Sequence, residues 1–158
     1  MLDLCTKLVK TLMKKGLTIS TAESCTGGLI AKCITDVSGA SSVFWGGVVS
    51  YDNSVKENVL KVKRETLETA GAVCDSTACQ MAEGVRKLLN TDIGISTTGI
   101  AGPGGGTPEK PVGTVYIGIS YLNETVSHLL HLDPTHSRDE IRHETVSAIL
   151  KLTLEKIS

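Results

Sequence analysis

The chain contains the stretch LTISTAESCTGGLIAK, residues 17–32, in which an apolar run leads directly into a serine, two glycines and a second apolar run. Residues 17–22 are expected to form a strand and residues 28–35 a helix, with Ser24 in the turn between them. A serine at such a turn can project its hydroxyl into a cleft, where the amides of the next helix can stabilise an anion. This arrangement suits a nucleophile beside an oxyanion hole. The alternative is a serine that only caps the helix, followed by glycines that allow close packing.

The composition excludes several classes of protein. With 158 residues the chain is long enough for one domain with a full core, which we expect to cover residues 1–158. A net charge of −1 and an aromatic content of 3% argue against a nucleic-acid-binding protein, which needs a positive surface or stacking side chains. Charged residues interrupt every N-terminal apolar run, and no run reaches the length of a membrane span. Neither a signal peptide nor a membrane partner is therefore expected.

The cysteines do not form a recognisable framework. Their number is odd and no pair has the CxxC spacing, so neither a disulfide scaffold nor a zinc site is expected. They stand at positions 5, 25, 33, 74 and 79. Most are interpreted as small buried side chains in a reducing cytoplasm. Cys25 follows Ser24 directly and is kept as an alternative thiol nucleophile.

The remaining elements alternate between helices and strands. The expected helices cover residues 4–15, 28–35, 52–60, 64–70, 75–89 and 137–156, and the expected strands cover residues 17–22, 43–51, 93–97, 114–121 and 125–131. The first helix ends at Gly16, and either Asp75 or Ser76 is expected to cap the long helix at residues 75–89. The last two strands form a hairpin across residues 122–124. This order predicts an α/β fold, a three-layer α/β/α sandwich with a mixed sheet.

A nucleophilic serine needs a base, and lysine is a better candidate here than histidine. The four histidines lie in the last third of the chain without a motif around them, so a Ser-His-Asp triad has little support; they are His128, His131, His136 and His143. Tyr51 is expected at the end of the strand at residues 43–51, and Lys56 in the first turns of the helix that follows. A lysine desolvated in a cleft can act as a base. The tyrosine could relay or steady the proton. The alternative is a strand-end tyrosine beside a solvent-exposed lysine.

A glycine-rich loop at residues 99–106 is the second candidate site. It has neither the GK[ST] ending of a phosphate-binding loop nor the GxGxxG spacing. Its glycines still allow backbone amides to approach a ligand or to form an anion-binding nest. A purely structural loop is the alternative.

Taken together, these segments resemble the CinA C-terminal domain family. The resemblance rests on five motifs in order: AESCTGG (22–28), GGVVSYDNSVKENVL (46–60), GAV (71–73), TTGIAGPGGGTPEKPVGTVYIGI (97–119) and SRDEIR (137–142). It covers almost the whole chain. The sequence departs from the family pattern in YDNSVK where YSNEAK is common, in Cys74-Asp75 where Ser-Glu is typical, and in His136-Ser137 where Gly-Asp is usual.

The resemblance implies a three-layer α/β/α domain. The family's stand-alone members include enzymes that hydrolyse the amide of nicotinamide mononucleotide to nicotinate mononucleotide and ammonia, and activity varies within the family. It places the nucleophile at Ser24 and its helpers at Tyr51 and Lys56. It also directs attention to Arg138 and Arg142 near the start of the last helix. No metal and no cofactor is implied.

The expected mechanism follows from this placement. Ser24 attacks the carboxamide, Lys56 takes the hydroxyl proton, and Tyr51 orients Lys56 or passes the proton on. Amides of residues 25–28 hold the oxyanion, each donor contributing on the order of 3 kcal/mol. The glycine-rich loop and Arg142 bind the ribose phosphate. The complete expected binding set is Cys25, Thr26, Gly27, Gly28, Thr98, Gly99, Gly102, Gly104, Gly105 and Arg142.

Two alternatives remain at this point. One is a non-catalytic nucleotide-binding module, which would have no use for Lys56, and the other is an amidase for a different pyridine amide. The distance between Lys56 Nζ and Ser24 Oγ discriminates between catalysis and simple binding. A homodimer is also expected, with Phe44 and Trp45 as either an interface anchor or a core pair.

Overall fold

A computed structural model describes all residues from 1 to 158. The helices are α1 (Leu2–Lys15), α2 (Leu29–Thr35), α3 (Asn53–Asn58), α4 (Arg64–Thr69), α5 (Asp75–Leu89) and α6 (Arg138–Ile157), with a 3-10 turn at Ala40–Ser42. The strands are β1 (Ile19–Glu23), β2 (Phe44–Val49), β3 (Ile93–Gly99), β4 (Thr114–Tyr121) and β5 (Glu124–His131). Apart from the 3-10 turn, the order of elements is the predicted one.

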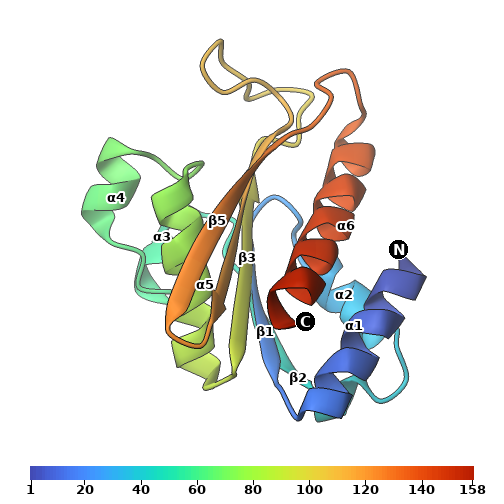
Figure 1. Cartoon of the computed structure of the whole chain (residues 1–158). Helices are drawn as coiled ribbons and strands as arrows, with labels where there is room; N and C mark the ends of the chain where they lie inside the picture. The colour runs from blue at the N-terminus through green and yellow to red at the C-terminus, as the bar shows by residue number, and fades with distance from the viewer.

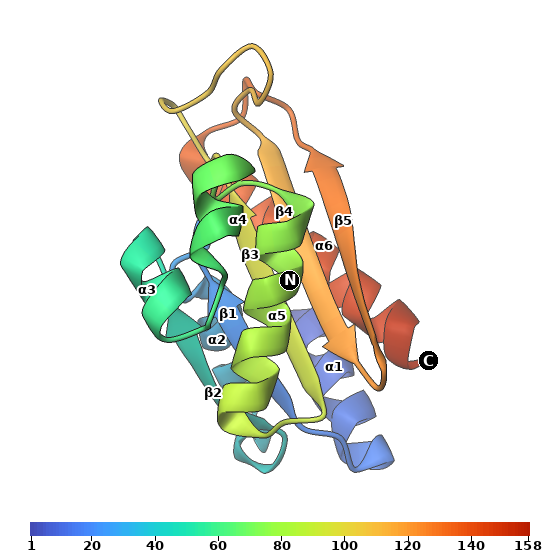
Figure 2. The same ribbon diagram turned by 90° about the vertical axis from the view of Figure 1, so that its left-hand side faces the viewer.

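The five strands form one mixed sheet in the order β2-β1-β3-β4-β5. Strand β1 runs parallel to both β2 and β3, whereas β4 and β5 are antiparallel to their neighbours. Helices α1, α2 and α6 cover one face, and α5 covers the other with α3 and α4 beside it (Figures 1 and 2). The predicted three-layer α/β/α fold with a mixed sheet is therefore confirmed.

The two faces of the sheet are built from different residues. The face toward α1, α2 and α6 carries the main core, in which isoleucines of the central strands recur at every second position: Ile19, Ile93, Ile95, Ile117 and Ile119. The face toward α5 carries serine and glycine instead. Ser96 Oγ donates to the carbonyl of Ala78, 2.5 Å away, and a Cβ added at Gly94 would lie 2.2 Å from the carbonyl of Ala82. Small residues therefore let the backbone of α5 lie directly on the sheet.

Several predicted boundaries differ from the observed ones. Strand β1 extends to Glu23, so Ser24 follows the strand without an intervening residue. The α5 cap is Cys74, whose thiol accepts from the Thr77 amide, rather than Asp75 or Ser76. The hairpin turn has two residues because Leu122 adopts a left-handed conformation with φ 54° and β5 begins at Glu124. None of the helices has the length and apolar character that crossing a bilayer requires.

Candidate active site

Ser24 and Lys56 meet at the carboxyl end of β1. The amide of Ser24 donates to the carbonyl of Thr97, 2.9 Å away, which holds the turn against β3. Helix α3 begins after Asp52, whose side chain accepts from the amide of Ser54 at 2.9 Å. One turn into α3, Lys56 extends toward β1 and places Nζ 3.0 Å from Ser24 Oγ. The structure thus brings together two residues that are 32 positions apart, at the distance a nucleophile and its base require.

The surroundings of Lys56 favour the neutral amine. The side chain is 1% exposed, and burial lowers the pKa of Lys56 more strongly than the nearby Asp52 raises it. Nζ also lies 2.7 Å from the carbonyl of Ser50 and 3.3 Å from that of Tyr51. In the neutral amine these two carbonyls accept both N–H groups, which leaves the lone pair for the hydroxyl of Ser24. The geometry therefore suits a general base.

Glu23 is a buried carboxylate that sequence reasoning did not single out. Its two oxygens accept from the amides of Gly28, Ile30 and Ala31 at 3.2, 3.0 and 2.9 Å, and from the hydroxyl of Thr26 at 2.5 Å. These amides are the free donors at the start of α2, so Glu23 caps this helix from the preceding strand. A serine cap is therefore wrong for Ser24, since the residue before α2 is Gly28 and no side chain at that position caps the helix.

The same contacts change which amides can face an oxyanion. Gly27 donates to the carbonyl of Ser24 at 3.1 Å, and Gly28 donates to Glu23. The expectation that both glycine amides serve the oxyanion is wrong, because the turn and the helix cap already use them. The amides of Cys25 and Thr26 have no acceptor within the protein. They are the available donors beside Ser24.

A cavity of about 240 Å³ opens over Ser24. Its lining is made by Ser24, Cys25, Tyr51, Asn53, Lys56, Ala72, Val73, Thr98, Gly99, Ala101 and Arg138. Of the predicted binding residues it thus includes Cys25, Thr98 and Gly99. The hydroxyl of Thr98 donates to the carbonyl of Ala72 at 2.7 Å, so this side chain helps to fix the wall opposite Ser24.

Tyr51 lies at the rim of this cavity rather than beside the lysine amine. Its side chain is 60% exposed, and its hydroxyl accepts from Arg138 at 2.6 Å. Only its backbone carbonyl contacts Lys56. The expectation that the phenol orients Lys56 is therefore wrong in this conformation. Arg138 also donates to the carbonyl of Gly102 at 2.8 Å and so connects the tyrosine to the glycine-rich loop.

The remaining predicted binding residues lie outside the cavity. Arg142 donates to the carbonyl of Thr26 at 2.8 Å and supports the serine turn. Gly104 and Gly105 are exposed, and Gly102 contributes a carbonyl to Arg138 rather than an amide to the cavity. From the sequence, Arg142 is predicted to be the cation that faces the ligand. In the structure it lies outside the cavity, and Arg138 is the arginine that lines it.

Cysteine and histidine nucleophile systems do not fit this arrangement. Burial raises the pKa of Cys25 to about 12, which keeps the thiol protonated and unreactive. No histidine lines the cavity; His136 contacts Glu144, and His143 contacts the carbonyl of Asp139. No group of three or more His, Cys, Asp or Glu side chains is arranged to hold a metal ion.

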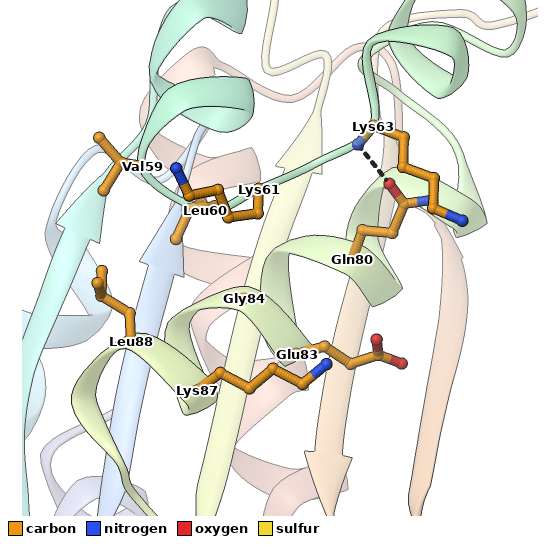
Figure 3. Close-up of a pocket in the computed structure, with 9 residues that line it drawn as sticks. All are labelled: Val59, Leu60, Lys61, Lys63, Gln80, Glu83, Gly84, Lys87 and Leu88. Atoms are coloured by element: carbon orange, nitrogen blue, oxygen red, sulfur yellow. Dashed lines mark hydrogen bonds between the residues drawn. The ribbon is translucent and has the colours of Figure 1, made fainter.

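A larger cavity of about 390 Å³ lies elsewhere, on the outer side of α5 (Figure 3). Residues of α5 and of the segment after α3 line it, and the amide of Lys63 donates to the side chain of Gln80 at 2.8 Å across one end. It shares no residue with the cavity over Ser24. It contains no nucleophile beside a base, so the chemistry is assigned to the smaller cavity.

Comparison with known proteins places this chain in a family. The CinA C-terminal domain matches residues 2–157. A relative from Thermoanaerobacter sp. (strain X514), named as a competence-damage inducible protein, is 59% identical over 88% of this chain and 33% of its own length. A CinA-like protein of Leptospira borgpetersenii is 56% identical over 84% of this chain and 32% of its own. This chain thus spans about a third of the length of these curated relatives.

Solved structures show the same fold. The competence/damage inducible protein CihA of Agrobacterium tumefaciens has a TM-score of 0.94 and 41% identity, covering 98% of this chain and 93% of that one. A CinA superfamily protein of Klebsiella pneumoniae has a TM-score of 0.94 and 29% identity, covering 99% and 96%. With the family model matching nearly every residue, the chain belongs to the CinA C-terminal domain family.

Proposed function

We propose that this protein is an amidase that hydrolyses nicotinamide mononucleotide to nicotinate mononucleotide and ammonia. The observation that carries the proposal is the 3.0 Å separation of Lys56 Nζ and Ser24 Oγ inside a cavity. A module that only binds nucleotides has no need for a desolvated lysine beside a serine. Burial of an amine costs folding stability, and groups with such perturbed pKa values cluster at functional sites. The choice of nicotinamide mononucleotide rests on the resemblance of the motifs to the family.

The proposed reaction begins with Ser24. Its Oγ attacks the carboxamide carbon while its proton moves to the neutral amine of Lys56. The amides of Cys25 and Thr26 stabilise the oxyanion. When the C–N bond breaks, Lys56 returns the proton to the departing amine, and ammonia leaves. Water, deprotonated by Lys56, then hydrolyses the acyl-enzyme.

Arg138 supplies the positive charge for the phosphate of the substrate in this proposal. It is the only arginine that lines the cavity, and its guanidinium is held at the rim by Tyr51 and Gly102. A guanidinium suits phosphate because its planar donors match two phosphate oxygens. Tyr51 would then act at the rim as a partner of Arg138 and not as a proton relay.

The test is ammonia release from nicotinamide mononucleotide by the purified protein. Ser24→Ala is expected to abolish turnover while substrate binding, measured by calorimetry, stays nearly intact. Lys56→Met is expected to lower kcat by on the order of 10²- to 10⁴-fold, the usual contribution of a general base. Ser42→Ala and Lys61→Met are matched controls at exposed positions and should keep full activity.

Two results would contradict the proposal. A Ser24→Ala protein with full activity would exclude the serine mechanism. Binding without turnover by the wild type would favour a nucleotide-binding module. Turnover of nicotinamide or nicotinamide riboside in preference to the mononucleotide would retain the amidase and change its substrate.

A further inference from the structure

The cavity of about 390 Å³ on the outer side of α5 has no role in the proposed hydrolysis. Small-molecule sites usually have volumes of about 300–1,000 Å³, so this cavity is large enough for a small ligand. Its walls are fixed by the fold. A Cβ added at Gly84 would lie 2.0 Å from the carbonyl of Leu60, so α5 and the segment after α3 are in direct backbone contact. At one end the side chain of Gln80 accepts from the amide of Lys63 and donates to the hydroxyl of Thr66 at 3.0 Å.

One side of this cavity is apolar. Figure 3 shows Val59, Leu60 and Leu88 gathered there. Leu60 is buried, but Val59 is 38% exposed and Leu88 is 51% exposed. Removal of such apolar surface from water is favourable, and a ligand with an apolar ring or short chain would cover both side chains.

The other side of the cavity is charged and carries more positive than negative side chains. Lys63 and Lys87 lie there with Glu83 (Figure 3). Neither lysine forms an ion pair or a hydrogen bond through its amine within the protein. A third lysine of the lining, Lys61, already donates from its amine to the carbonyl of Asn58 at 2.9 Å. Two amines are therefore free to bind an anion beside the apolar side.

Lysines alone do not distinguish this cavity from other parts of the surface. A cavity of similar volume over α1 is also lined by three lysines, Lys7, Lys10 and Lys14, but its lining includes no hydrophobic residue. An ion pair that stays in water contributes little free energy. The cavity on α5 differs because it offers charge and apolar surface to the same ligand.

We propose that the cavity on α5 binds a small amphiphilic anion. The apolar ring or chain of the ligand lies against Val59 and Leu88. Its carboxylate, sulfonate or phosphate head pairs with the amines of Lys63 and Lys87. Ion pairing places the head, and burial of the apolar part supplies most of the affinity. The proposal does not rest on hydrolysis at Ser24, because the two cavities share no residue.

The test compares two fluorescent probes that differ only in their charge. Anilinonaphthalene sulfonate is the anionic probe, and phenylnaphthylamine has the same rings without the sulfonate. Both are titrated into the purified, folded protein. The wild type is expected to bind one sulfonate probe per chain and to bind the neutral probe about 5- to 30-fold more weakly, the contribution of two partly exposed ion pairs. Added salt should weaken binding of the sulfonate but not of the neutral probe.

Variants place the binding in this cavity. The double variant Lys63→Met and Lys87→Met keeps the apolar stems, so it should weaken sulfonate binding about 5- to 30-fold and leave binding of the neutral probe unchanged. Leu88→Ser should weaken binding of both probes about 3- to 10-fold, because it removes apolar surface that the rings cover. The matched control is the double variant Lys10→Met and Lys14→Met on α1, which should bind both probes as the wild type does.

Four outcomes would overturn the proposal. They are the absence of saturable sulfonate binding by the wild type, more than one bound probe per chain, equal affinity for the two probes, and unchanged sulfonate binding in the double variant of the α5 cavity. All the substituted side chains are exposed, so each variant is expected to fold, and circular dichroism checks this.

Discussion

Replacement of Glu23 by glutamine tests whether a buried carboxylate holds the nucleophile turn in place. All four partners of the two carboxylate oxygens are donors: the hydroxyl of Thr26 and the amides of Gly28, Ile30 and Ala31. Glutamine has nearly the same shape, but one of its terminal atoms is an NH₂ donor. It therefore changes charge and hydrogen bonding without leaving a cavity.

The magnitude follows from these contacts. One side-chain oxygen receives three bonds and the other receives only the bond from Ala31, so the amide NH₂ is expected to face Ala31. An unpaired buried donor costs about 1–3 kcal/mol. Loss of the negative charge at the start of α2 costs up to about 2 kcal/mol. Burying a neutral amide costs less free energy than burying a charged carboxylate, and this difference offsets part of the two losses. The net expectation is a loss of about 2–4 kcal/mol.

Chemical denaturation at neutral pH measures this loss, with Glu68→Gln as the control. Glu68 is exposed in α4 and makes no hydrogen bond through its side chain, so its substitution should change the free energy of unfolding by less than about 0.5 kcal/mol. Thermal unfolding gives a second readout. For a chain of this size, 2–4 kcal/mol corresponds to a fall in Tm of about 5–15 °C.

A Glu23→Gln protein as stable as the wild type would refute this reasoning. It would mean that water or a rearranged turn satisfies the α2 amides as well as the carboxylate does. Activity is expected to fall with stability, because the Cys25 and Thr26 amides that face the proposed oxyanion belong to the same turn. Full activity combined with lower stability would show that Glu23 stabilises α2 without affecting the geometry of the site.

Two further predictions concern charged residues of the site. Burial lowers the pKa of Lys56, so between that value and about 10.4 the unfolded chain binds one more proton than the folded chain. The free energy of unfolding of the wild type, relative to that of Lys56→Met, should therefore rise with pH in this range by up to about 1.4 kcal/mol per pH unit. Above this range the difference should level off. A difference that does not depend on pH would contradict a desolvated lysine. Arg138→Ala should raise KM for nicotinamide mononucleotide about 10- to 100-fold with little effect on kcat. This factor corresponds to the usual contribution of hydrogen bonds to a charged group. An equal rise in KM for the riboside, which lacks the phosphate, would remove Arg138 from the proposed phosphate site.

The fold was predictable because its signals are local and periodic. The strand at residues 114–121 alternates regularly, and its observed bounds match the prediction. Helix α5 was equally clear, since its buried residues recur at helical spacing and its end at Leu89 coincides with the expected one. Predicted boundaries failed where a tertiary contact decides them. Glu23, for example, belongs to β1 because it pairs with Val49 of β2 and with Thr97 of β3, contacts that lie far away in the sequence.

The site was predictable only in part, for the same reason. The turn that carries Ser24 and the helix that carries Lys56 could each be recognised locally, but their separation depends on how β1 and β2 pair. The contact between Tyr51 and Arg138 joins residues 87 positions apart. No local pattern distinguishes Arg138 from Arg142, although one lines the cavity and the other supports the serine turn from outside it. An acidic residue immediately before a glycine-rich turn is the signal that could have indicated Glu23 as a cap.

The two buried titratable side chains of the site, Glu23 and Lys56, are kept apart by the alternation of side chains along a strand. Glu23 points toward α2 on one face of the sheet, and the next residue, Ser24, meets Lys56 of α3 on the other. If the carboxylate shared a face with the lysine, the ion pair would hold Lys56 in its charged form and remove the base. The helix amides absorb the charge of Glu23 instead, and Lys56 is left with carbonyl partners. One strand can therefore place a carboxylate directly before the nucleophile and still leave the lysine free to accept its proton.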